Sequence, residues 1–158
     1  MEPPLTLVEP LSAAQWGVAR RLVEEYAAAL GLDLAFQDFD DEVEHLAREY
    51  GPPGGAFLVA ALAGEAVGCV GLRAHVEGVG EMKRLYVAPA GRGRGTGRAL
   101  VAGIVARARA LGYRRMVLDT LPSMHAARAL YRSFGFREIA PYRYNPVPGT
   151  SFLALELD

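Results

Sequence analysis

Residues 81–100 read EMKRLYVAPAGRGRGTGRAL, a pattern that predicts a strand, a glycine-arginine loop and the start of a helix, in that order. The loop glycines allow backbone conformations closed to other residues and a close approach to a ligand. They are Gly91, Gly93, Gly95 and Gly97. The helix that follows adds unpaired N–H donors and the positive end of its dipole, while three arginines add formal charge. The segment therefore predicts a site for an anion such as a diphosphate.

The composition favours a cytoplasmic protein built as one compact domain. The chain has 158 residues, 51% of them hydrophobic, which is enough to bury a core. Cys69 is the only cysteine, so we expect no intrachain disulfide and a reducing compartment. The first residues lack a basic region followed by an apolar run, so no signal peptide is expected. Gly64 and Glu65 interrupt the longest apolar stretch, which favours two strands over a membrane span.

The charges are distributed unevenly along the chain. Residues 1–79 hold 13 acids and 4 bases, whereas residues 80–158 hold 5 acids and 13 bases, so the two halves carry −9 and +8. Ordinary solvated surface explains many of these residues. As a pattern, the asymmetry suits an enzyme that joins a polyanionic cofactor to a cationic or amine acceptor. Nucleic acid is not favoured as a partner, because the arginines are not interleaved with stacking aromatic residues.

Apolar periodicity and turn residues place the remaining elements. The expected helices run from the cap Ser12 to Leu30, from Gln37 to about Tyr50, from the glycine loop to Gly112, and from Ser123 to Phe134. The expected strands cover residues 5–11, 56–62, 66–75, a stretch beginning near 80, 114–119, 136–140 and 152–157. The middle strands form an antiparallel meander, and the unit around the glycine loop is a parallel strand–helix–strand.

Two common phosphate-binding motifs do not fit the loop. A P-loop needs Lys and then Ser or Thr at the helix start, where this chain has Arg98 and Ala99. The dinucleotide fingerprint fails as well, because Thr96 and Arg98 stand where it needs glycine or alanine. That failure also removes Asp119 as a candidate for binding a ribose.

Two motifs resemble those of the GNAT superfamily of N-acetyltransferases. Residues 92–97, RGRGTG, are similar to the pyrophosphate loop of that family, and residues 129–136, ALYRSFGF, are similar to its second signature. The resemblance covers essentially the whole chain. It implies an α/β (α+β) fold with a mixed, mostly antiparallel central sheet of about six to seven strands, flanked by about four helices.

The resemblance also implies acetyl-CoA, or another acyl-CoA, as the donor and direct transfer to an acceptor that is usually an amine. It assigns the pantetheine arm and the thioester to the backbone of the strand before the loop, at Leu85, Tyr86 and Val87. It assigns the pyrophosphate to the loop itself, at Arg92, Gly93, Arg94, Gly95, Thr96, Gly97 and Arg98. Met124 stands where the family often has an asparagine that contacts pantetheine.

An ammonium acceptor must lose a proton before it attacks, so the site needs a base. The resemblance points to Glu81, with a water relay or a merely solvent-facing glutamate as the alternatives. It assigns Tyr131 as the acid that protonates the departing thiolate, with packing as the alternative. Asp38, beside Phe36 and Phe39, and Tyr142 are candidates for binding the acceptor. Asp38 and the acids that follow it also have a simpler explanation in the helix dipole.

The leading hypothesis is an N-acetyltransferase that acts on a small amine or an amino terminus. The alternatives are a non-catalytic acyl-CoA sensor and a nucleic-acid binder with a basic surface. The three histidines lack metal-ligand spacing, so no metal is expected. Strands at the edge of the sheet offer a route to a homodimer.

Overall fold

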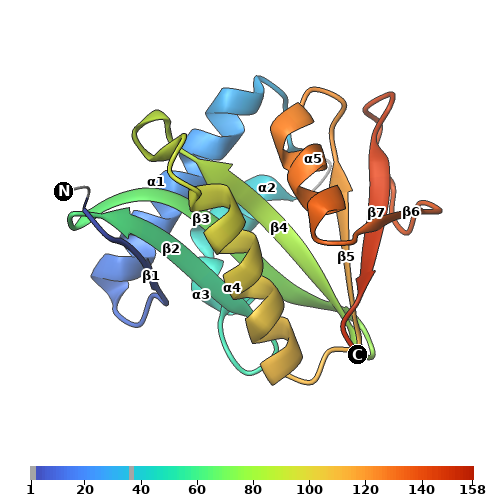
Figure 1. Ribbon diagram of the computed structural model, residues 1–158, viewed down its shortest axis with the longest axis horizontal. Helices are drawn as coiled ribbons and strands as arrows, with labels where there is room; N and C mark the ends of the chain where they lie inside the picture. Colours follow the sequence, from blue (N-terminus) through green and yellow to red (C-terminus); the bar gives the residue numbers. More distant parts are fainter. Residues whose placement is uncertain (1–2, 36–37) are drawn as a thin grey trace.

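The computed structural model describes residues 3–35 and 38–158, which form one sheet of seven strands in the order β1-β2-β3-β4-β5-β7-β6 (Figure 1). Only the β4–β5 pair is parallel, and the other pairs are antiparallel. The strands are β1 (Leu5–Val8), β2 (Ala56–Leu62), β3 (Glu65–Val76), β4 (Val79–Val87), β5 (Arg115–Thr120), β6 (Arg137–Ile139) and β7 (Ser151–Glu156). The expected mixed, mostly antiparallel sheet is confirmed.

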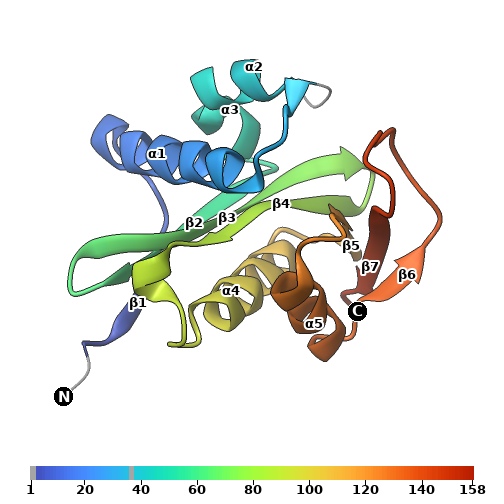
Figure 2. The same cartoon turned by 90° about the horizontal axis from the view of Figure 1, so that it is seen from above.

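Helices cover both faces of the sheet (Figure 2). Those on the first face are α1 (Ala13–Leu30), α2 (Phe39–Glu44) and α3 (Leu46–Tyr50), and those on the second are α4 (Thr96–Ala110) and α5 (His125–Ser133). Each face has its own apolar core. Leu100 and Ile104 of α4 belong to one core, and Leu22 and Val23 of α1 belong to the other. Within the described part of the chain, no helix is both long enough and apolar enough to cross a bilayer.

The ends of α1 follow from local sequence, as expected. The Ser12 hydroxyl accepts a hydrogen bond from the Gln15 amide at 3.1 Å, and the Gln15 side chain accepts one from the Ser12 amide at 3.1 Å. This reciprocal pair is a capping box, which satisfies donors that a helix start leaves unpaired. At the other end, Gly31 takes a φ of 65°, a left-handed conformation that glycine adopts without strain.

The expected helix from Gln37 to Tyr50 is wrong in one respect, because it is broken into α2 and α3 at His45. A continuous helix would bond the His45 amide to the Asp41 carbonyl. Here the His45 ring nitrogen Nδ1 contacts that carbonyl at 3.0 Å, and the His45 amide donates to the Glu42 carbonyl instead. The side chain thus competes with the backbone ladder. Phe36 and Gln37 lie outside the described residues.

Strands β4 and β5 form a fork. They pair only from Val79 to Glu81 on β4, although β4 continues to Val87. Four residues of β4, from Lys83 to Tyr86, lie opposite three residues of β3, which marks a bulge in β4. Within the bulge Arg84 has a φ of 61°, a left-handed conformation that is uncommon for a residue with a side chain. The fork leaves the β5-facing edge of β4 without a strand partner beyond Glu81.

Candidate active site

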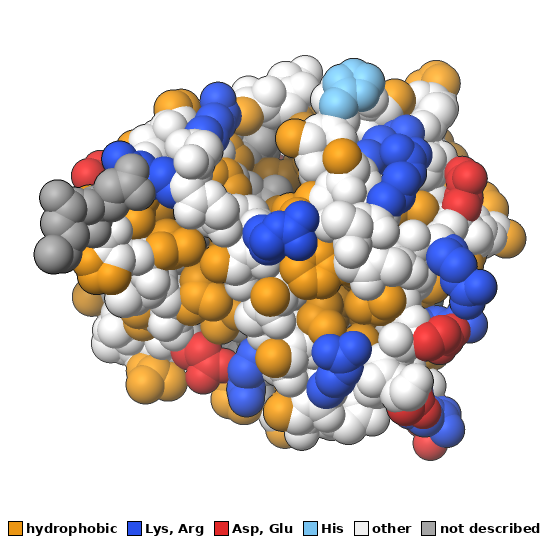
Figure 3. Space-filling model, viewed as in Figure 1, with side chains coloured by type: hydrophobic (Ala, Val, Ile, Leu, Met, Phe, Trp, Pro, Cys, Tyr) orange, Lys and Arg blue, Asp and Glu red, His pale blue; other side chains and the backbone are white. Residues whose placement is uncertain are grey.

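A groove lies on the face of the sheet that α4 and α5 cover, and it has a volume of about 610 Å³. Figure 3 shows a recess on this face with hydrophobic side chains at its floor and basic side chains near its rim. The groove runs from β4 over the glycine loop to α5. Its lining residues are Leu85, Val87, Gly91, Arg92, Gly93, Gly95, Thr96, Gly97, Ala126, Ala127 and Leu130.

The glycine loop is shaped to present backbone amides to an anion. Gly93 and Gly95 both have a φ of 74°, and Gly95 begins α4 without a side-chain cap. The first amides of α4 are therefore not satisfied by a capping side chain. The Thr96 hydroxyl is buried and donates to the Gly91 carbonyl at 2.7 Å, which holds the loop closed beneath these amides. Loop and helix start together fit the diphosphate of a nucleotide-like ligand.

The three arginines of the loop and helix start are exposed, and one of them lines the groove. Arg92 lines the groove, and its Nε donates to the Val87 carbonyl at 3.3 Å. Arg98 bonds the Ser133 hydroxyl at 3.1 Å and lies over the Phe134 ring. Arg94 and Arg98 are not among the lining residues, so within the groove Arg92 supplies the nearest formal charge. Their flexible guanidinium groups still raise the positive potential at the rim.

Of the residues expected to bind pantetheine, Leu85 and Val87 line the groove and Tyr86 does not. Tyr86 packs against the core on the α1 face, and its hydroxyl lies 3.4 Å from Glu25. This placement follows from strand geometry, since successive side chains point to opposite faces. A contact of Tyr86 with a ligand would therefore be made by its backbone.

A second pocket, of only about 30 Å³, occupies the fork itself, with Tyr26 and Leu30 of α1 on one side. It is lined by Tyr26, Leu30, Leu34, Met82, Lys83, Arg84, Leu85, Asp119, Leu121, Met124, Tyr131 and Asn145. Leu85 lines both this pocket and the groove, so the two meet at Leu85. The fork pocket has room for a small group of a second ligand, such as an amine, next to the groove wall at Leu85.

Tyr131 reaches the fork from α5. Its ring is buried and packs against Phe136 with the ring centroids 5.7 Å apart. Burial raises the pKa of the Tyr131 hydroxyl, which therefore stays protonated at neutral pH. Among the described residues this hydroxyl has no hydrogen-bond partner. Tyr131 is thus placed to donate a hydrogen bond to a ligand in the fork.

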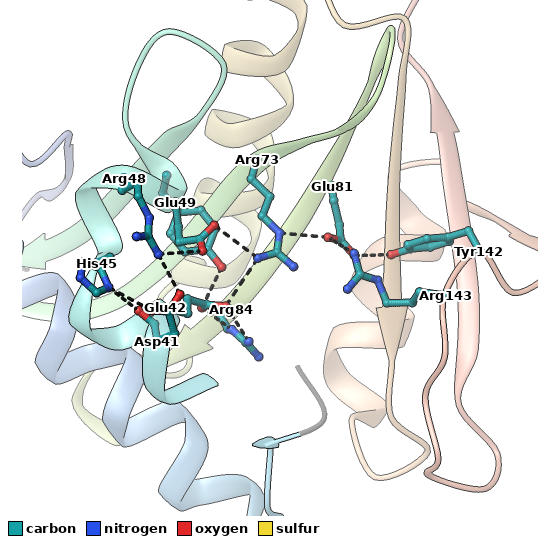
Figure 4. A network of polar contacts seen from close by, with 11 residues as sticks. Asp41, Glu42, His45, Arg48, Glu49, Arg73, Glu81, Arg84, Tyr142 and Arg143 are labelled. Carbon is teal, nitrogen blue, oxygen red and sulfur yellow. Dashed lines mark hydrogen bonds and ion pairs between the residues drawn. The ribbon is translucent and has the colours of Figure 1, made fainter. Parts of the chain in front are cut away.

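Glu81 is fully buried at the closed end of the fork, where three groups hold its carboxylate (Figure 4). The Tyr142 hydroxyl and an Arg143 nitrogen each donate to it at 2.7 Å, and Arg73 Nε donates at 3.2 Å. Glu81 is not a lining residue of the fork pocket. Its contacts tie β3 and β4 to the segment between β6 and β7, which borders the fork.

The left half of the same network anchors the bulge of β4 (Figure 4). Glu42 accepts hydrogen bonds from Arg84 at 2.8 and 2.9 Å and from the Tyr50 hydroxyl at 2.8 Å. Burial by itself raises the pKa of Glu42, but the hydrogen bonds and charge of Arg84 outweigh it, so the pKa lies below its ordinary value. This ion pair lies where the backbone of Arg84 is strained.

The residues expected to bind the acceptor are not brought together. Asp38 is exposed at the start of α2 and does not line the fork pocket, and Phe36 lies outside the described residues. Tyr142 lies on the opposite side and uses its hydroxyl on Glu81. Over residues 3–35 and 38–158, no group of three or more His, Cys, Asp or Glu side chains is arranged to hold a metal.

The sequence interpretation missed the polar residues of the fork pocket, namely Lys83, Asp119 and Asn145. Asn145 Nδ2 donates to Asp119 Oδ2 at 3.0 Å. Burial, followed by the charge of Arg84, lowers the pKa of Lys83 to about 8. One signal was available, since Lys83 and Arg84 are adjacent charged residues between Met82 and Leu85 of β4. The α5 wall of the groove, with Ala126 and Ala127, carried no comparable signal.

Comparison with known proteins places this arrangement in one family. The model of the acetyltransferase (GNAT) family matches residues 20–136. A protein of Schizosaccharomyces pombe, named an uncharacterized N-acetyltransferase, is 46% identical over 140 residues, covering 87% of this chain and 86% of its own. A GNAT acetyltransferase of Staphylococcus aureus superimposes with a TM-score of 0.81 at 18% identity, over 98% of this chain and 100% of its own. The protein yncA of Salmonella typhimurium, solved with acetyl-CoA, superimposes with a TM-score of 0.70 at 21% identity, over 98% and 94%.

Proposed function

Because the chain belongs to the acetyltransferase (GNAT) family, we propose that it transfers an acetyl group from acetyl-CoA to the amine of a small molecule or an amino terminus. The observation that carries the proposal is the junction at Leu85, where a groove with an anion site meets a pocket lined by polar groups. The donor would lie in the groove, and the amine of the acceptor would occupy the fork pocket. Direct attack in a ternary complex needs that arrangement.

Three regions of the site would each hold a different part of acetyl-CoA. The amides of the glycine loop and the start of α4, with Arg92, would hold the diphosphate of coenzyme A. The unpaired edge of β4 beyond Glu81 would hold the pantetheine arm by backbone hydrogen bonds. The N–H group near Leu85 would then polarise the thioester carbonyl and stabilise the oxyanion that forms when the amine attacks.

Tyr131 would complete the reaction on the leaving-group side. As the carbon–sulfur bond breaks, negative charge develops on sulfur, and a hydroxyl that stays protonated can donate to it. Tyr131 lines the fork pocket, and its hydroxyl is not engaged by the described residues and is kept protonated by burial. These three properties support the role of acid.

Glu81 as the base stays a prediction, with a water relay as its alternative. Its carboxylate already accepts three hydrogen bonds, two of them from arginines. Taking up a proton would weaken both ion pairs, so these contacts favour a role in holding the β6–β7 segment against the sheet.

A screen of acceptors tests the proposed function. The purified protein is incubated with acetyl-CoA and a panel of small amines, amino acids and peptides with a free amino terminus, and products are followed by mass spectrometry and by thiol release. We expect an acetylated amine and an equal amount of free CoA. If acetyl-CoA binds but no amine in the panel is acetylated, an acyl-CoA sensor is the better account.

A further inference from the structure

We propose that Asp119 binds the ammonium group of the acceptor and takes its proton, and that Asn145 positions the Asp119 carboxylate. The proposal rests on the proposed function and assigns one step of it to a residue. Asp119 lies at the end of β5, on the fork, and lines the same pocket as Leu85 and Tyr131. A base must lie within reach of the amine that approaches the thioester, and this pocket adjoins the groove at Leu85.

The other polar groups of the pocket are unsuited to accept this proton. Burial raises the pKa of Tyr26 and of Tyr131, so both remain protonated donors. Arg84 stays charged and is bound to Glu42 through two nitrogens. The amide of Asn145 has no basic site.

Lys83 is the remaining alternative. Burial lowers its pKa to about 8, so at neutral pH most of the population carries a charge and accepts no proton. A charged Lys83 repels an acceptor ammonium and leaves Asp119 as the only anionic side chain that lines this pocket among the described residues. The charge pattern of the pocket therefore directs the ammonium to Asp119.

The carboxylate of Asp119 accepts fewer side-chain hydrogen bonds than that of Glu81. Glu81 is fully buried and bonded by three side chains. Asp119 is partly exposed, and only its Oδ2 receives a side-chain hydrogen bond, from Asn145. Among the described residues, no donor is bonded to Asp119 Oδ1. This oxygen is therefore available to an ammonium group.

Asn145 is fixed in the orientation that this role requires. Its Oδ1 accepts a hydrogen bond from the Val147 amide at 3.0 Å, which turns its Nδ2 toward Asp119. Asn145 is thus a positioning residue, and its own contact with Val147 sets which carboxylate oxygen remains open. The loop that carries it follows Tyr142 and Arg143, which Glu81 holds in place.

The groups that face Asp119 come from four elements. They are Tyr26 of α1, Lys83 and Arg84 of β4, Tyr131 of α5, and Tyr142 with Asn145 of the β6–β7 segment. The charge of Asp119 contributes to the raised pKa of Tyr131 and of Tyr142, after the larger effect of burial. Asp119 therefore acts electrostatically on the same tyrosine that faces the leaving group.

The protons balance through the two residues. The acceptor ammonium gives one proton to Asp119 Oδ1, and the neutral amine forms the carbon–nitrogen bond at the thioester carbonyl. When the carbon–sulfur bond breaks, Tyr131 gives its proton to the thiolate. The second proton lost by the nitrogen restores Tyr131, and the proton on Asp119 passes to solvent. The net products are an acetamide, CoA and one proton.

The test compares Asp119→Asn with Glu81→Gln, and uses Glu77→Gln on the exposed β3–β4 turn as the matched control. The substrate is the most active amine of the acceptor screen, and kcat/KM is measured between pH 6 and 9. We expect Asp119→Asn to lower kcat/KM by about 10²-fold at pH 7. The remaining activity should rise about tenfold per pH unit up to the pKa of the amine, because only the amine that is already neutral can then attack.

Two further measurements separate this role from a structural one. Acetyl-CoA affinity, measured by calorimetry, should be unchanged in Asp119→Asn. Asn145→Ala should lose about tenfold in kcat/KM, and its remaining activity should show the same rise with pH, which is the pH signature of a missing base. Unchanged kcat/KM in Asp119→Asn, or the pH signature appearing in Glu81→Gln instead, overturns the assignment. No turnover by the unaltered protein contradicts the proposed function itself, and the role of Asp119 falls with it.

Discussion

Tyr131→Phe is expected to lower kcat by about 10²-fold at neutral pH while acetyl-CoA binds with unchanged affinity. The substitution keeps the ring that packs on Phe136 and removes only the hydroxyl that faces the fork. Because burial raises the pKa of this hydroxyl, the wild-type donor is present throughout the range from pH 6 to 9. The loss should therefore be similar across that range. Steady-state rates of CoA release give kcat, and calorimetry gives the affinity.

Tyr144→Phe is the matched control, because it removes a hydroxyl from a tyrosine that is 74% exposed outside the fork. It should keep the wild-type kcat. If Tyr131→Phe also keeps the full rate at every pH, the assignment of Tyr131 as the acid is wrong. A loss confined to acetyl-CoA affinity would instead assign Tyr131 to binding.

Glu42→Gln should lower the free energy of unfolding by about 3–5 kcal/mol, since removing one partner of a buried ion pair leaves the other charge uncompensated. That is a large part of the stability of a typical domain, about 5–15 kcal/mol. The glutamine keeps the shape of the side chain but leaves the guanidinium of Arg84 buried without its counter-ion. Urea unfolding followed by circular dichroism measures the effect.

The same pair predicts a dependence on pH. The pKa of Glu42 is lowered in the folded chain, so its contribution is complete above the ordinary carboxyl pKa and is lost as the pH falls through the folded value. The stability difference between wild type and Glu42→Gln should therefore shrink in acid. Glu24→Gln, in the exposed pair with Arg20, is the control and should leave the stability nearly unchanged. Equal losses in the two variants would contradict the special role of the buried pair.

The parts of the fold that depend on local sequence could be predicted. The capping residue Ser12, the glycine that ends α1 and the apolar stripe of α4 each act within one or two turns of helix. The break at His45 could not be predicted, because it depends on a side chain that contacts a carbonyl of the preceding turn. The bulge at Arg84 was equally hidden, since a distant partner, Glu42, holds the side chain of that strained residue.

The candidate site also has one part that is contiguous in the sequence and one part that is assembled from distant segments. The glycine loop is contiguous in the sequence, so its residues could be selected together, and Arg92 and Thr96 of that loop line the groove. The fork pocket is assembled from α1, β4, β5, α5 and the β6–β7 segment, and no spacing in the sequence records that meeting. Asp119 was considered only as a ribose ligand for that reason. Glu81 was selected by position along β4, but its burial and its two arginine partners became visible only in the structure.

Calorimetric titration with CoA and with pantetheine, which lacks the diphosphate and the phosphorylated adenosine attached to it, tests most directly that the glycine-arginine loop binds the diphosphate-bearing end of CoA. Two or more charge-assisted hydrogen bonds to the diphosphate should make CoA bind at least about 100-fold more tightly than pantetheine. The affinity for CoA should fall as salt rises, because exposed arginines are screened. Equal affinities for the two compounds, or no heat with CoA on folded protein, would contradict the account.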